Sequence, residues 1–126
     1  MVPGGGGVVK HEINSRMKNL ALEIIRVVEG LPRTEVSQIL GRQILRSATS
    51  VGANYRSACR ARSRADFIAR VAIAEEEADE TQYWLELLHE WGPIHGDQFE
   101  RLVDETDQLT AILAASGKTA KEHLKN

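Results

Sequence analysis

Arginine, whose side chain can bind phosphate, is concentrated between residues 41 and 70 of this sequence. The stretch carries seven arginines and a single acid, Asp66. On an α-helix, four of these arginines fall within an arc of about 80°: Arg42, Arg46, Arg56 and Arg60. Because a guanidinium group binds phosphate bidentately and keeps its charge, this arginine face predicts contact with a nucleic-acid backbone.

Two further arginines, Arg62 and Arg64, follow this face and complete the predicted nucleic-acid-binding set. The face carries no aromatic side chain for base stacking, so we expect binding that tolerates many nucleotide sequences. The alternative is that the arginines are solvated or pair with acids. Residues 71–107 carry twelve acids and only one basic residue other than histidine, Arg101, and could supply such partners from the same or a neighbouring chain.

Two pairs of acids suggest an alternative function, hydrolysis of nucleotides with the help of Mg²⁺. Glu77 and Glu80 form one pair, and Asp104 and Asp107 form the other. Magnesium ions prefer carboxylate oxygens together with substrate phosphates, and all-α nucleotide pyrophosphohydrolases hold Mg²⁺ through acidic pairs on helices. Acids are dense throughout this region, so chance spacings are expected and the non-enzymatic interpretation is preferred.

Other potential catalytic or metal-binding groups are isolated. Glu86 and His89 have the Glu-x-x-His spacing of di-iron helical bundles, but no second pair of this type occurs in the sequence. We therefore expect no metal, no cofactor and no catalytic residues. Cys59, the only cysteine, is interpreted as a small buried side chain. The lack of disulfides, of a signal peptide and of a long apolar segment predicts a cytoplasmic protein that does not bind membranes.

The elements that position these residues are predicted to be four helices, over about residues 9–29, 35–62, 64–91 and 98–116. Apolar residues recur every three or four positions within each range, and Gly-Pro or capping residues separate the ranges. Residues 1–8 are expected to form a flexible arm, and residues 118–126 a charged tail. Short connections predict an up-down-up-down antiparallel four-helix bundle over residues 9–117, an all-α fold.

The third predicted helix carries more apolar surface than one bundle core can cover. Beside its main core positions lies a second stripe formed by Ile73, Trp84, Leu87 and Trp91. Tryptophan is enriched where protein subunits meet, so this stripe predicts an interface between copies of the chain. Packing inside one bundle is the alternative.

Several segments resemble a known family. The runs QILRSATSVGAN at 43–54, SRADF at 63–67 and EEEADETQYWLELL at 75–88 are similar to four-helix-bundle proteins first described as encoded by intervening sequences of bacterial 23S ribosomal RNA genes. The positions that match the family pattern are Arg46, Ser47, Ala48, Ser50, Val51, Ala53, Asn54, Asp66, Phe67 and Glu80. The chain is more distantly similar to accessory variability proteins of diversity-generating retroelements.

The resemblance implies a cytoplasmic, ring-like homopentamer without known enzymatic activity. The retroelement relatives bind a reverse transcriptase and nucleic acid through a basic surface. After Asn54, where the family commonly has an acidic residue and glycine, this chain reads Tyr55-Arg56, which makes the arginine face more basic. We therefore expect an oligomeric interaction module, with RNA, DNA or a nucleoprotein as its partner.

Overall fold

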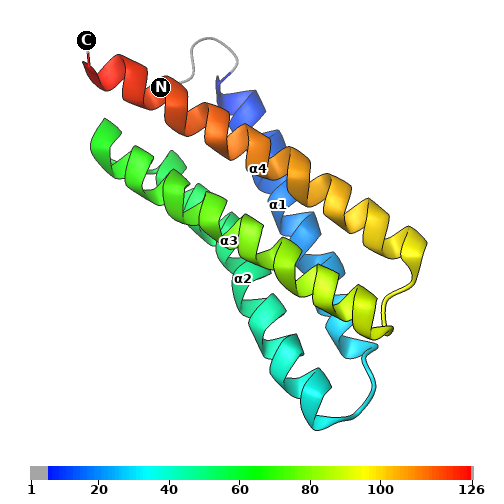
Figure 1. Ribbon diagram of the computed structural model, residues 1–126. Helices are drawn as coiled ribbons and strands as arrows, with labels where there is room; N and C mark the ends of the chain where they lie inside the picture. The colour runs from blue at the N-terminus through cyan, green and yellow to red at the C-terminus, as the bar shows by residue number, and fades with distance from the viewer. Residues whose placement is uncertain (1–5, 126) are drawn as a thin grey trace.

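The computed structural model describes residues 6–125, which form four helices and no strand (Figure 1). The helices are α1 (Gly6–Glu29), α2 (Glu35–Cys59), α3 (Arg64–Trp91) and α4 (Gly96–Lys125). Each helix reverses the direction of the one before it, so the predicted all-α bundle is confirmed for this part of the chain. None of these helices combines the length and the apolarity needed to cross a membrane.

The core follows the three- and four-residue spacing seen in the sequence. On α3, the buried residues are Val71, Ala74, Ala78, Thr81, Leu85 and Leu88. The helix packs with this stripe between α2 and α4, whereas α1 packs mainly on α2. Two ion pairs, Arg16 with Glu105 and Arg101 with Glu23, connect α1 to α4. The charged side chains of the described residues therefore lie around one continuous core that is mainly apolar.

Gly52 lies where α2 packs closely on α1. A Cβ atom added to Gly52 would lie 3.4 Å from the Cβ of Met17 on α1. Glycine weakens a helix by about 1 kcal/mol relative to alanine. The close packing of the two helices explains why glycine is tolerated at this position. Met17, on the α1 side of the contact, is fully buried.

The ends of two helices differ slightly from the predictions. Helix α1 begins at Gly6 instead of residue 9, and residues 1–5 of the predicted arm lie outside the described residues. Helix α2 ends at Cys59 instead of residue 62, because the N–H of Arg60 turns back to the carbonyls of Ser57 and Ala58. Ser63 then caps α3 by accepting a hydrogen bond from the N–H of Asp66 at 3.0 Å.

The prediction that the last helix ends at residue 116 is wrong. Helix α4 continues through Gly117 to Lys125, so most of the predicted tail is helical. The extension still packs on the bundle, since Ala120 is only 4% exposed and a Cβ atom at Gly117 would lie 3.6 Å from Val71. Burial of this apolar face stabilises the helix beyond Gly117, the residue that directly follows the predicted end and whose type commonly ends helices.

Candidate nucleic-acid interface

The structure divides the predicted arginine face into one paired residue and three open ones. Arg46 is paired: its Nη1 lies 3.0 Å from Glu77 Oε2, and its Nη2 bonds Glu80, both on α3. The hydrogen bonds to Glu80 and then Glu77 raise the pKa of Arg46 above its usual value. Arg46 is therefore an α2–α3 packing residue: the alternative, pairing with acids of residues 71–107 of the same chain, holds for it and replaces its predicted contact with nucleic acid.

Glu80 is held by a second donor from its own helix. Its Oε2 accepts a hydrogen bond from Trp84 Nε1 at 3.0 Å. That hydrogen bond, followed by the one from Arg46, lowers the pKa of Glu80, although partial burial opposes the shift. Beneath this cluster, the fully buried hydroxyl groups of Ser47 and Thr81 hydrogen-bond each other at 2.9 Å. Helices α2 and α3 thus meet through a layer of polar contacts that sets their relative position.

Arg42, Arg56 and Arg60 form what we call the open arginine surface of α2. All three are exposed, and none is ion-paired with a carboxylate of the described residues. Arg42 and Arg56 lie on one side of the helix and Arg60 directly follows its last residue, so the three span about 27 Å along the axis. This surface presents three fixed positive charges to solvent, as phosphate binding requires.

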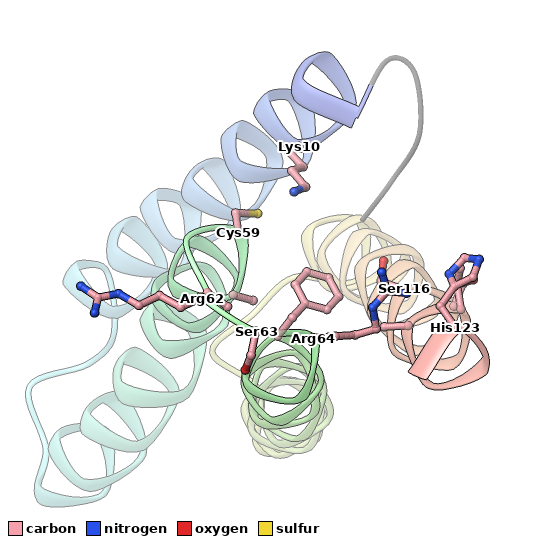
Figure 2. A pocket seen from close by; sticks show the side chains of 13 residues that line it. Lys10, Cys59, Arg62, Ser63, Arg64, Ser116 and His123 are labelled. Carbon is pink, nitrogen blue, oxygen red and sulfur yellow. The ribbon is translucent and has the colours of Figure 1, made fainter. Parts of the chain in front are cut away.

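The remaining two predicted arginines lie in the corner between α2 and α3. Arg62 is exposed, and its side chain points away from the cavity shown in Figure 2. Arg64 is half-buried at the start of α3 and extends toward Ser116 on α4. The fold therefore does not place Arg64 on the open arginine surface.

The two acidic pairs proposed for Mg²⁺ are not brought together. Glu77 and Glu80 face α2 and are engaged by Arg46, whereas Asp107 on α4 accepts a hydrogen bond from Gln82 at 2.8 Å. No group of three or more His, Cys, Asp or Glu side chains in the described part of the chain could hold a metal ion. The geometry gives no support to a nucleotide hydrolase site.

His89 has a structural environment at the α3–α4 connection. Its Nδ1 lies 3.2 Å from the carbonyl oxygen of Ile94, and its ring stacks on Phe99 with centroids 4.1 Å apart. Glu86, the other half of the Glu-x-x-His pair, is exposed on α3. The imidazole therefore holds the connecting turn against α4.

Known proteins share the sequence pattern and the helix arrangement of this chain. A family model for 23S rRNA-intervening sequence proteins matches residues 10–115. The chain belongs to this family. A crystal structure of a protein of unknown function from the S23 ribosomal protein family of Bacteroides thetaiotaomicron is 37% identical, covers 84% of this chain and 98% of its own, and superposes with a TM-score of 0.79. No curated protein matches the sequence.

In this member of the 23S rRNA-intervening sequence family, the predicted interface stripe is only partly open. Ile73 and Trp91 are 44% and 45% exposed, while Trp84 and Leu87 are half-buried. Val36 and Ile39, on the opposing helix α2, are also exposed and were not included in the prediction. The sequence signal for them was that both are apolar residues outside the core stripe of α2. The interface remains a prediction.

A cavity at one end of the bundle was also missed by sequence reasoning. It lies where the start of α1, the α2–α3 corner and the last turns of α4 meet (Figure 2). The signal in the sequence is a set of small residues near the helix ends, which leave space where the four helices converge: Ala58, Ala61, Ala115, Ser116 and Ala120. Part of its α4 wall lies beyond the region matched by the family model.

Proposed function

We propose that this protein is a non-enzymatic interaction module that binds RNA or DNA, free or within a nucleoprotein, through the open arginine surface of α2. The observation that supports the proposal is that Arg42, Arg56 and Arg60 are exposed and without a carboxylate partner in the described residues, whereas Arg46 between them is neutralised. Unpaired guanidinium groups on a rigid helix can contact phosphates without first breaking an ion pair.

The chemistry of the surface favours contact with phosphates over reading of bases. The exposed aromatic residue Trp91 and the exposed Tyr83 belong to α3, and α2 has no exposed aromatic side chain for a base to stack on. Phosphate contacts position a protein on nucleic acid but carry no direct sequence information. Binding should therefore depend on salt and vary little with nucleotide sequence.

We further propose that several copies assemble through the apolar stripe of Ile73, Trp84, Leu87 and Trp91. Ile73 and Trp91 are large apolar side chains that remain nearly half exposed in the single chain. The family resemblance favours a ring-like homopentamer, which would repeat the open arginine surface around the ring. Several weak contacts then combine, so a mildly acidic protein can still bind a polyanion.

The nucleic-acid proposal is tested by fluorescence anisotropy with labelled single-stranded and double-stranded probes at several salt concentrations. Arg56→Gln/Arg60→Gln should weaken binding and lower the log–log salt slope by about 0.7–0.9 for each phosphate that the variant no longer neutralises. Arg46→Gln is the matched control, because it removes the same type of charge from an arginine already paired with Glu77 and Glu80. Its salt slope should remain that of the wild type.

Three results would contradict this function. The first is an absence of binding by the wild type at low salt, and the second is an equal loss in the Arg46→Gln control. The third is turnover of nucleoside triphosphates that requires Mg²⁺ and disappears in Glu80→Gln, which would restore the hydrolase alternative. Assembly is tested separately by light scattering: Trp91→Glu should give a smaller particle than the wild type, and a monomeric wild type would refute it.

A further inference from the structure

We propose that the cavity at the open end of the bundle, here called the end cavity, binds an amphipathic organic anion: a single apolar chain with a carboxylate or phosphate head. The cavity has a volume of about 520 Å³. This lies within the range of about 300–1,000 Å³ typical of small-molecule sites. The proposal concerns a different part of the molecule from the open arginine surface and does not depend on it.

The floor of the end cavity is apolar. Its lining includes Phe67 from α3, Ala58 from α2 and Ala120 from α4. Ala58 and Ala120 are buried at 2% and 4% exposure, while Phe67 is half-buried and packs against the main core. An alkyl chain placed here would cover the part of Phe67 that the bundle itself leaves open, which favours its transfer from water.

The rim of the end cavity is positively charged. Lys10 and Arg64 are the cations among its lining residues that extend beside it, whereas the side chain of Arg62 points away, and no aspartate or glutamate lines it. Neither Lys10 nor Arg64 has a carboxylate partner within the described chain. Elsewhere Arg16, Arg46 and Arg101 all reach an acid on a neighbouring helix. This one-sided charge in an otherwise acidic protein selects an anion.

The two half-buried cations approach the cavity from different helices. Figure 2 shows Lys10 pointing from α1 into the cavity, while Arg64 extends from α3 toward Ser116 on α4. The hydroxyl groups of Ser116 and Thr119 also belong to the lining and add hydrogen-bond donors. An anionic head between Lys10 and Arg64 would therefore leave its chain over the apolar floor.

The side of α4 that closes the cavity comes from the extension beyond the family match. Thr119, Ala120 and His123 follow residue 115, the last position of that match. If α4 ended at residue 116, this wall would be missing and the apolar floor would face water. The helical extension thus has a role in building the end cavity.

The test is isothermal titration calorimetry with the full chain and four probes: decanoate, decyl phosphate, decanol and inorganic phosphate. Decanoate or decyl phosphate should bind saturably, and the preferred head distinguishes a fatty acid from a phosphate ester. Decanol keeps the chain without the charge, and inorganic phosphate keeps the charge without the chain. Decanol should bind more weakly by about tenfold or more, since it lacks the charge-assisted hydrogen bonds of the anionic head. Inorganic phosphate should also bind more weakly by about tenfold or more, since it buries no alkyl chain.

Substitutions locate the site. Lys10→Met/Arg64→Gln should weaken binding of the preferred anion by about tenfold or more. Lys18 is an exposed lysine on α1 outside the cavity, so Lys18→Met should leave the dissociation constant within about twofold of the wild-type value. Ala115→Phe should fill the cavity and abolish binding, and Ala115 is exposed, so the core is not disturbed. Ala111→Phe, one turn earlier on α4, is its matched control.

The proposal is overturned if neither amphipathic anion binds the wild type saturably, or if decanol binds as tightly as both of them. It is also overturned if the Lys18→Met and Ala111→Phe controls lose as much affinity as the cavity variants. Circular dichroism of each variant shows whether it is folded. Should the double variant unfold, Ala115→Phe still decides the question, because it leaves Lys10 and Arg64 in place.

Discussion

The direction of the change in stability caused by one substitution, Gly117→Ala, tests whether α4 continues past residue 116. In the structure, Gly117 lies inside the helix, and its added methyl would lie 3.6 Å from Val71 Cγ1, an ordinary van der Waals distance. Alanine restricts the unfolded chain and favours the helix, which stabilises a compatible site by about 0.4–1 kcal/mol. For a domain of this size, the midpoint of thermal unfolding should rise by roughly 2–5 °C.

The same substitution would have the opposite effect if the helix ended at this glycine. A C-terminal glycine usually adopts a left-handed conformation, which costs alanine about 1–2 kcal/mol. Gly92→Ala provides a matched control, because Gly92 ends α3 with φ of 124° and should lose stability on substitution. Both variants are measured by urea and thermal unfolding followed by circular dichroism. A lower free energy of unfolding for Gly117→Ala would refute the helical extension and, with it, the wall of the end cavity.

Two other predictions concern contacts between helices. Trp84→Phe removes the largest cause of the lowered pKa of Glu80, so that pKa should rise when followed by NMR; an unchanged pKa would contradict the role of the indole. Because the pKa of Glu80 in the folded protein lies below the usual 4.5, the stabilisation from Glu80 is present above about pH 4.5 and is lost as pH falls through the folded pKa. The stability that is lost on acidification should therefore be smaller in Trp84→Phe. Gly52→Leu should destabilise the protein by about 1–3 kcal/mol in urea unfolding, since its Cβ atom would already lie 3.4 Å from Met17; a stability equal to the wild type would show that α1 and α2 do not approach so closely.

Local patterns in the sequence were sufficient to predict the four helices and most of the core. Leu85 follows Val71 by two heptads and Leu88 follows Leu85 by three residues, and this spacing alone places them on one side of a helix. The cap at Ser63 could be predicted for the same reason, because its partner Asp66 lies three residues away. Helix packing then follows from the need to bury each apolar stripe.

Only the tertiary structure decided which arginines are open. Arg46 looked like Arg42, Arg56 and Arg60 in the sequence, since all four share one side of α2. It meets Glu77 and Glu80 because of the register between α2 and α3, which depends on how both helices pack. A pairing over more than 30 residues of chain leaves no local pattern.

The length of α4 and the existence of the end cavity both depend on contacts between distant parts of the chain. Gly117 is a stop signal when only its neighbours are considered, but contact with Val71 and burial of Ala120 outweigh its low helix propensity. The cavity requires Lys10, Arg64 and the last turns of α4 to converge from distant parts of the chain. The sequence by itself determined the helices and their apolar faces, because those depend on spacing within a few turns; the pairing of charges, the end of α4 and the space between helices depend on how separate faces meet.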